Sequence, residues 1–182
     1  NSNDGIEEEV KKFEDIILIQ NKENLGYSGG NNIGIKCALA AGAEYIFILN
    51  PDTEIDENCI SVLVDVSNKG DILGPEIYFY GTNKIWYAGG VLNLANVLGA
   101  HRGVDKEDKG QYNQIEKTDY ASGAAIFIKR EVFEKIGFFD ERYFLYYEDS
   151  DFCMRAKNDG FKIIYVPKAK VYHHNAQSTG LG

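Results

Sequence analysis

Short apolar runs alternate with helix-like stretches through the first 80 residues, and this alternation constrains the fold more than any other feature. Three runs read as strands because they are short, rich in β-branched and aromatic residues and poor in charge: residues 15–20 (DIILIQ), 44–50 (EYIFILN) and 71–80 (DILGPEIYFY). Residues 29–43 and 56–70 lie between them and end at or next to a glycine, as helices commonly do. Strands that alternate with helices predict an α/β fold with a mostly parallel sheet flanked by helices.

The second half of the chain continues this pattern less regularly. No repeat or low-complexity segment divides it, so we expect one domain over residues 1–182. Residues 101–117 are polar and charged, and they predict either a loop or a lid. The remaining predicted elements are strands at 84–94, 119–130 and 161–167 and helices at 131–137 and 148–160.

The composition is that of a globular domain with more acidic than basic residues. The 182 residues are 44% hydrophobic and carry a formal net charge of −9, with a pI near 4.8. Nucleic-acid binders usually present a basic face, so we expect no nucleic-acid partner. An acidic protein can still bind a phosphorylated small molecule when a divalent cation lies between them.

The cysteines and the apolar runs limit the cellular context. Cys37, Cys59 and Cys153 form no C-x-x-C pair, so they predict neither a disulfide framework nor a zinc site and fit a reducing compartment. No apolar run reaches the ~20 residues that span a bilayer, and no signal peptide is visible. The chain begins at Asn1 without an initiator Met, and we expect a fragment of a longer protein.

A glycine-rich turn, NLGYSGGNNIG at residues 24–34, joins the first predicted strand to the first predicted helix. It has neither the G-x-G-x-x-G nor the G-x-x-x-x-G-K-[ST] spacing, so it supports neither a dinucleotide site nor a phosphate loop. Glycines such as Gly29 let a ligand approach the backbone, and Asn31 or Asn32 can cap the helix and offer amide hydrogen bonds. A tight turn that needs positive φ explains the glycines equally well.

Asn50 and Asp52 stand at the end of the predicted strand at 44–50, separated by Pro51. Ligands of open α/β sheets bind at the carboxyl ends of strands. A hard divalent cation takes oxygen ligands, which the Asp52 carboxylate and the Asn50 amide both supply. Asn, Pro and Asp are also turn residues, so a simple turn is the alternative.

Three carboxylates, Glu148, Asp149 and Asp151, fall within one turn at the start of the predicted helix at 148–160. Acidic residues favour helix N-termini, and Asp151 can pair with Arg155 four residues later, so one interpretation is structural. The other is catalytic, since a carboxylate beside aromatic rings gains the proton affinity that a general base needs.

His173 and His174 follow the last predicted strand in the sequence VYHHNAQS. Neutral imidazole is a common metal ligand, although a histidine on a surface loop usually has no role. Two adjacent side chains point in different directions, so at most one of these histidines can be a metal ligand.

Taken in order, these stretches resemble the family 2 glycosyltransferases, in particular the bacterial rhamnosyltransferase-like branch. The resemblance implies a GT-A fold of the Rossmann type, a nucleotide-sugar donor and inversion at the anomeric carbon. Family members begin with a strand, a helix and a second strand, so it also implies that this chain lacks the first βαβ elements. The resemblance covers nearly the whole chain and is carried by NSNDG (1–5), NLGYSGGNNIG (24–34), LNPDT (49–53), the stretch from DYASGAAIFIKR to IIYVP (119–167), and VYHH (171–174).

The resemblance assigns donor-side roles position by position. Asp52 of NPD matches a D-x-D-like motif that binds metal and diphosphate, with Asn50 in place of its first aspartate. His173 fits an H-x-x-G-x-S pattern, with Ala176 at the glycine position, and would be a metal ligand or a diphosphate contact. The donor-binding residues that we expect are Asn1, Asp4, Gly29, Asn31, Asn50 and Asp52.

The resemblance also assigns the catalytic and acceptor-side roles. Asp149 matches the catalytic base, and Glu148 and Asp151 flank it. Tyr146 and Tyr147, from the aromatic run YFLYY, would form a wall on the acceptor side together with Asp151, although core packing explains the run equally well.

The implied function is transfer of a sugar, rhamnose in this branch, from a dTDP- or UDP-sugar to a saccharide or lipid-linked saccharide in cell-surface polysaccharide synthesis. Mg²⁺ or Mn²⁺ at Asp52 would neutralise the leaving diphosphate. Asp149 would deprotonate the acceptor hydroxyl on the opposite face, which gives inversion by a single displacement, and the segment at 101–117 would exclude water as a lid. The family also implies a cytoplasmic location, with peripheral association at the inner face of the cell membrane.

Two other functions stay open. A sugar-nucleotide nucleotidyltransferase also uses an α/β sheet and Mg²⁺, but it would carry a basic glycine-rich signature, and residues 24–34 contain no Lys or Arg. A non-catalytic nucleotide-sugar-binding domain would fold without transferring sugar.

Overall fold

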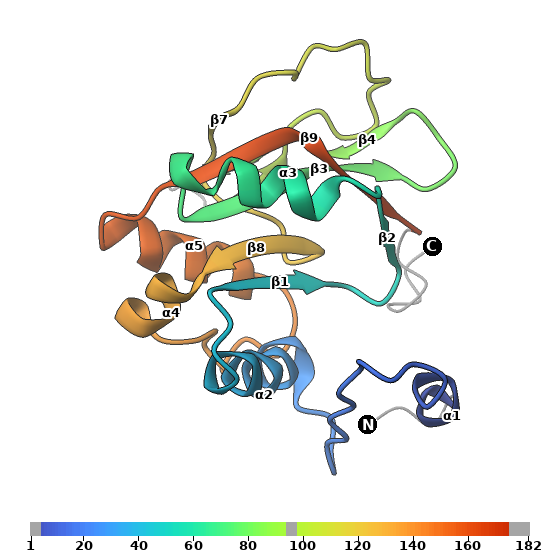
Figure 1. Cartoon of the computed structure of the whole chain (residues 1–182). Coiled ribbons are helices and arrows are strands. Elements are labelled where there is room, and N and C mark those ends of the chain that lie inside the picture. The colour runs from blue at the N-terminus through green and yellow to red at the C-terminus, as the bar shows by residue number, and fades with distance from the viewer. Residues whose placement is uncertain (1–4, 94–97, 175–182) are drawn as a thin grey trace.

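A seven-stranded sheet runs through the computed structural model, which describes residues 5–93 and 98–174 (Figure 1). The strands of the described residues are β1 (Tyr45–Leu49), β2 (Thr53–Ile55), β3 (Ile72–Phe79), β4 (Ile85–Tyr87), β5 (Gly90–Asn93), β6 (Leu98–His101), β7 (Glu116–Lys117), β8 (Ala125–Lys129) and β9 (Ile163–His173). The main path of the sheet has the order β1–β8–β3–β9–β2, with β4 paired to β3 and β7 paired to β9. β5 and β6 pair with each other in a separate two-stranded sheet.

β1, β3 and β9 point in the same direction, and β8 runs against them. β3 is parallel to β9, whereas β8 is antiparallel to both of its neighbours, β1 and β3. β8 takes this inner position because its first four residues are all buried. The predicted α/β architecture is therefore confirmed, and the sheet of the described residues is mixed because a strand from the second half inserts between two parallel strands of the first.

Helices cover the sheet and bury a common core. α3 packs on β9 and β3, α2 packs on β1, and α4 packs on β8 and α5 (Figure 1). Leu63, Tyr87, Phe152 and Tyr165 are fully buried in the core between these elements. α1 buries no residue and lies apart from the sheet (Figure 1). The helices are α1 (Ile6–Val10), α2 (Gly26–Ala40), α3 (Cys59–Asp65), the 3-10 turn η1 (Ser67–Lys69), α4 (Arg130–Ile136) and α5 (Glu148–Asn158).

A bulge sets the register of β9 on β3. Pro75 lies opposite Val166, but the next residue, Glu76, lies opposite Lys170. Proline cannot donate to a ladder, so an interior strand that contains it needs such an interruption. Beyond the bulge the pairing continues to His173, which brings the end of β9 to the edge of the sheet where β1 also ends.

The predicted strand at residues 15–20 is wrong. These residues are coil, and Ile17 is 75% exposed. A strand needs a backbone partner, and within the described residues β1 pairs only with β8. Ile16 and Ile17 lie in a hollow beside β1 and α2 without pairing with either.

The predicted asparagine caps of the first long helix are also wrong. α2 begins at Gly26, three residues earlier than expected, and Asn24 Oδ1 accepts a hydrogen bond from the Gly26 N–H at 3.0 Å. Asn31 therefore lies inside the helix and donates to a carbonyl one turn earlier, at 2.9 Å. Asn32 is buried, donating to the Phe139 carbonyl at 2.9 Å and accepting from its N–H at 3.1 Å.

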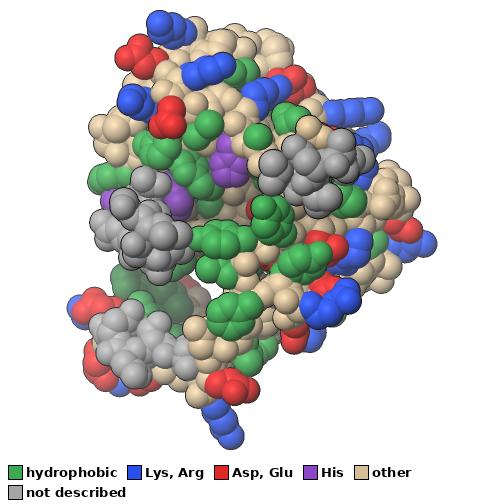
Figure 2. Space-filling model, turned by 180° about the vertical axis from the view of Figure 1, so that it is seen from behind, with side chains coloured by type: hydrophobic (Ala, Val, Ile, Leu, Met, Phe, Trp, Pro, Cys, Tyr) green, Lys and Arg blue, Asp and Glu red, His purple; other side chains and the backbone are tan. Residues whose placement is uncertain are grey.

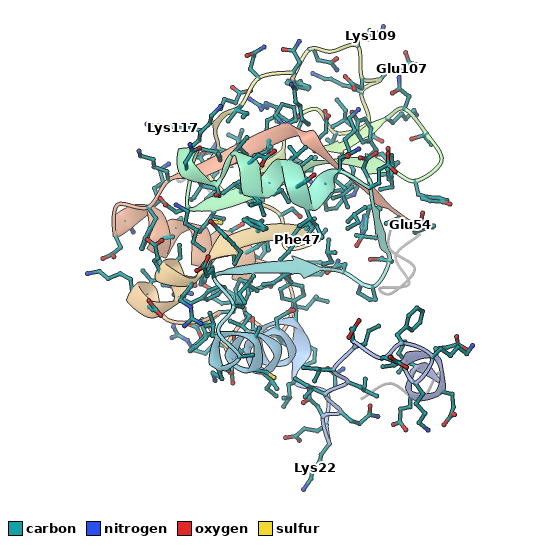
Figure 3. The ribbon with its side chains drawn as sticks, in the orientation of Figure 1. Lys22, Phe47, Glu54, Glu107, Lys109 and Lys117 are labelled. Atoms are coloured by element: carbon teal, nitrogen blue, oxygen red, sulfur yellow. The ribbon has the colours of Figure 1, made fainter. Side chains whose placement is uncertain are left out.

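Of the predicted segment 101–117, the ends belong to β6 and β7, and residues 102–115 between them form a loop that is fixed to β3 and β4. The Tyr78 hydroxyl donates to Asp108 at 2.7 Å, and backbone hydrogen bonds join the loop to β4 and to the residues before it. Glu107 and Lys109 project outward at the end of the molecule remote from β1 (Figure 3). The structure shows the segment as a loop held by these bonds, and its action as a lid stays a prediction.

Candidate active site

One edge of the sheet, where β1 and β9 end, brings together several of the polar residues that the sequence singles out. β1 and β9 end at this edge, β8 begins there, and α5 starts beside it. The ends enclose a cavity of about 280 Å³, here called the edge cavity. Figure 2 shows the molecule from behind, with histidine side chains set among hydrophobic ones. The edge cavity is lined by Tyr27, Asn50, Asp52, Trp86, His101, Ser122, Gly123, Ala124, Leu145, Tyr146, Glu148, Asp149 and His173.

Asp52 and His173 meet at one side of the edge cavity. β2 pairs with the end of β9 so that Thr53 lies opposite His173, and the His174 N–H donates to the Asp52 carbonyl at 2.9 Å. This pairing leaves Asp52 Oδ1 3.3 Å from His173 Nε2. Burial lowers the pKa of His173 more than the Asp52 carboxylate raises it, which favours the neutral imidazole.

The turn predicted at Asn50–Asp52 is present as well. The Thr53 N–H and hydroxyl both donate to the Asn50 carbonyl, at 3.2 and 2.7 Å. The Asn50 N–H donates to the Ala124 carbonyl at 3.0 Å, which fixes the turn to the start of β8. The turn and site interpretations thus apply together, because this turn holds Asn50 and Asp52 against the edge cavity.

Asp149 lies across the edge cavity, at the start of α5. Its Oδ2 accepts a hydrogen bond from the Gly123 N–H at 2.9 Å, and its Oδ1 accepts one from the Ser150 N–H at 2.6 Å. Gly123 has no room for a side chain, since a Cβ there would lie 2.8 Å from Tyr27 Oη. The Ser150 hydroxyl also donates to Oδ1, at 3.2 Å. These donors fix the carboxylate, and Oδ2, with one donor, keeps a lone pair for a further proton.

Glu148 is the more deeply buried neighbour of Asp149. It is 5% exposed, and its Oε2 has no hydrogen-bond partner among the described residues. Burial raises the pKa of Glu148 to about 7, with a further increase from the Asp149 carboxylate and an opposing effect of its own backbone N–H. Glu148 therefore exchanges a proton near neutral pH.

The two tyrosines before α5 have a strained backbone. Tyr146 and Tyr147 have φ of 72° and 69°, in the left-handed region that non-glycine residues rarely adopt. Both are about half exposed, which rules out core packing for them. Tyr146 lines the edge cavity, and Tyr147 lines the hollows beyond it.

Asp151 has the contact that its structural interpretation predicts. Its Oδ2 accepts a hydrogen bond from Arg155 Nε at 2.8 Å. It does not line the edge cavity but borders an adjacent hollow.

Trp86 and His101 line the edge cavity although sequence reasoning missed both. The Trp86 ring lies 4.3 Å from the ring of His101 and 4.7 Å from that of His173, centroid to centroid. Burial lowers the pKa of His101 below its ordinary value. The sequence feature that could have pointed to them is their rarity, because the chain has one Trp and three His.

Some predicted donor-binding residues lie away from the edge cavity. Asn31 lines the hollow beside β1, and Gly29 is buried in α2, where a Cβ would lie 2.8 Å from Leu25 Cβ. Contact of these two residues with a donor stays a prediction. In the structure, Gly29 allows close packing against Leu25. Asn1 and Asp4 lie outside the described residues.

Asp52 and His173 are suited to coordinate a divalent cation whose other ligands come from a bound diphosphate and water. Asp52 Oδ1 and His173 Nδ1 are buried and have no hydrogen-bond partner in the part of the chain that the structure describes. No group of three or more His, Cys, Asp or Glu that could hold a metal occurs in that part. Mg²⁺ characteristically takes one or two protein ligands and completes its shell with phosphate oxygens and water, so two ligands suffice when a diphosphate supplies the others.

The fold is that of a GT-A glycosyltransferase. A crystal structure of GalNAc-T7 with UDP, GalNAc and Mn²⁺ superposes with a TM-score of 0.72 at 18% sequence identity, covering 94% of this chain and 35% of that one. At this identity the likeness concerns the fold alone. Residues 1–137 match the family described as Glycosyl transferase family 2, and the chain belongs to that family.

Curated relatives cover most of the chain. The low-salt glycan biosynthesis hexosyltransferase Agl10 of Haloferax volcanii is 33% identical over 157 residues, which is 82% of this chain and 49% of the relative. The N-acetylglucosaminyl-diphospho-decaprenol L-rhamnosyltransferase of Mycobacterium tuberculosis is 29% identical, over 94% of this chain and 62% of its own length. The dTDP-rhamnosyl transferase RfbF of Shigella flexneri is 29% identical, over 94% and 56%. The chain thus spans less than two thirds of the length of these relatives.

Proposed function

We propose that this domain is the catalytic part of an inverting glycosyltransferase that moves a sugar from a nucleoside diphosphate to an acceptor hydroxyl. The observation that carries the proposal is the edge cavity itself. Asp52 and His173, whose Oδ1 and Nε2 lie 3.3 Å apart, are on one side of it, and the fixed carboxylate of Asp149 is on the other. Membership of the family supports the same reaction class.

In this mechanism the two sides of the edge cavity have different tasks. Asp52 and His173, with Asn50 beside them, hold the diphosphate end of the donor and its Mg²⁺ or Mn²⁺, which when bound neutralises the charge of the departing diphosphate. Asp149 takes the proton of the acceptor hydroxyl as that oxygen attacks the anomeric carbon from the opposite face. One base and one displacement invert the configuration at that carbon.

Glu148 supports the base in this scheme. With a pKa raised to about 7, it is partly protonated at neutral pH and limits the negative charge next to Asp149. Trp86 and Tyr146 wall the cavity, so they would exclude water from a donor bound there.

The names of the relatives support a particular donor and acceptor class. Two of them are named as rhamnosyl transferases, one with dTDP in its name and one with a diphospho-decaprenol acceptor. We therefore assign a dTDP- or UDP-sugar as donor, with rhamnose as the first sugar to test, and a saccharide or lipid-linked saccharide of cell-surface polysaccharide synthesis as acceptor. The described residues contain no helix with the length and apolar character to cross a membrane. From the lipid-linked acceptor class, we assign the reaction to the inner face of the cell membrane, on the cytoplasmic side, by peripheral association.

The direct test is calorimetric titration of the chain with dTDP, UDP and GDP, each with and without Mn²⁺. We expect one nucleotide to bind only with metal and Asp52→Asn to abolish that binding. Asp65→Asn is the matched control, because Asp65 is an exposed carboxylate on α3. Equal loss in both variants, or metal-independent binding, would contradict the assignment of the metal ligands.

The same samples separate the alternative functions. A folded chain that binds a nucleotide but transfers no sugar to any acceptor would be a non-catalytic domain. A chain that forms a nucleotide sugar from a nucleoside triphosphate and a sugar 1-phosphate would be a nucleotidyltransferase.

A further inference from the structure

Two more hollows continue the edge cavity past Asp149. The middle hollow, of about 320 Å³, shares His101, Tyr146 and Asp149 with the edge cavity. The outer hollow, of about 370 Å³, shares Tyr147 and Ser150 with the middle one. The three form one trough, and the outer two each have the size of a small-molecule site, which is typically about 300–1,000 Å³.

We propose that the outer hollow binds the second sugar of a neutral saccharide acceptor whose terminal sugar occupies the middle hollow beside Asp149. This inference rests on the proposed function, because that function places the attacking hydroxyl at Asp149. An acceptor that reaches Asp149 from the side opposite Asp52 must extend along the trough, since the donor occupies the edge cavity. The next unit of the acceptor then lies in the outer hollow.

The lining of the outer hollow matches the two-sided chemistry of a sugar. Leu92, Tyr143, Tyr147 and Met154 supply apolar and aromatic surface, and Tyr143 and Tyr147 are 36% and 52% exposed. A pyranose ring offers C–H groups that pack on such rings and hydroxyls that need polar partners. Asp151, whose Oδ2 accepts a hydrogen bond from Arg155, supplies a carboxylate acceptor at the rim.

The charges of the trough exclude a diphosphate next to the terminal sugar. Asp149 and Asp151 border the middle and outer hollows, and no Lys or Arg among the described residues lines either one. Arg155, the neighbouring cation, donates to Asp151 and to the carbonyls of Ile136 and Phe138, so it is already engaged. Phosphate sites use free cations or a bridging divalent cation, such as the one proposed at Asp52 and His173. A diphosphate in the middle or outer hollow would face carboxylates without either. If the acceptor is lipid-linked, its diphosphate lies beyond the second sugar.

The test compares three kinds of acceptor on the full chain loaded with Mn²⁺ and dTDP or UDP. The probes are a panel of neutral methyl disaccharides, the matched methyl monosaccharides, and the same monosaccharides as diphosphate esters of a short alcohol. Affinities are measured by saturation-transfer NMR titration. Met154→Trp fills the outer hollow, Tyr147→Ala removes its aromatic wall, and Val64→Trp adds the same indole to an exposed position of α3.

We expect at least one disaccharide to bind about tenfold more tightly than its monosaccharide, a difference of about 1.4 kcal/mol. Met154→Trp and Tyr147→Ala should each abolish that advantage, and Val64→Trp should keep it. Binding of the nucleotide reports whether each variant is folded. Equal affinity of mono- and disaccharides across the panel, a retained advantage in Met154→Trp, or preference for the diphosphate esters would overturn the assignment. Failure of every protein to bind a nucleotide would instead overturn the proposed function, and this assignment with it.

Discussion

Glu148→Gln should change how the stability of the domain depends on pH. Burial raises the pKa of Glu148 from 4.5 to about 7 in the folded chain. Between these two values the folded state binds more protons than the unfolded state, so stability falls as pH rises. Glutamine has the same shape and no charge, so this part of the pH dependence should vanish in the variant.

The size of the effect follows from the shift in pKa. Between pH 5 and pH 8, a carboxyl whose pKa rises from 4.5 to about 7 on folding lowers the stability by about 2.5 kcal/mol. The side chain is 5% exposed, so solvent screens this effect little. The glutamine amide finds no ready partner at the position of Oε2 and should cost about 1–3 kcal/mol at every pH.

The assay is urea denaturation of both proteins at pH 5 and at pH 8. The quantity of interest is the change with pH in the free-energy difference between variant and parent, because the constant cost of the amide cancels. Glu57→Gln is the control, since Glu57 is exposed and should show no such change. A pH-independent difference between Glu148→Gln and the parent would refute the claim that the folded chain holds this carboxyl protonated near neutral pH.

Three further substitutions test the site and its support. Asp149→Asn keeps the side-chain shape but removes the base, so single-turnover transfer should fall by about 10²–10⁴-fold while nucleotide binding persists; unchanged transfer would rule out Asp149 as the base. In Gly123→Ala the new Cβ would lie 2.8 Å from Tyr27 Oη, and urea denaturation should show a loss of about 1–3 kcal/mol, whereas parental stability would mean that the turn adjusts freely. Tyr78→Phe removes the hydroxyl that lies 2.7 Å from both the buried Glu76 Oε2 and Asp108 Oδ2, so the same assay should show a loss of about 1–3 kcal/mol, and no loss would mean that the two carboxyls find other partners.

The local chemistry of the chain was readable from its sequence. The apolar runs at 44–50 and 71–80 became β1 and β3, and the acidic stretch at Glu148 became the start of α5. The motif around Asp52 was assigned to a strand end, where the structure has it. These assignments succeeded because short-range periodicity and turn chemistry depend on neighbouring residues.

Assignments that depended on a distant partner failed or were missed. Residues 15–20 have the composition of a strand but pair with no strand in the described part of the chain. The caps of α2 were misplaced because Asn32 bonds to Phe139 and not to its own helix start. Trp86 and His101 reach the edge cavity only through the pairing of β4 with β3 and of β6 with β5, which no local pattern records.

The sequence by itself determined the α/β class, the polar residues at the strand ends and the acidic helix start, because propensity and hydrophobic period are local properties. Only the tertiary structure decided that β8 lies between β1 and β3, and that β2 pairs with the end of β9. The second pairing brings Asp52 Oδ1 to 3.3 Å from His173 Nε2, and the packing of α5 sets Asp149 across the cavity from them. Strand order and side-chain convergence are chosen by burial and hydrogen bonding summed over the whole chain, and a single segment does not encode that sum.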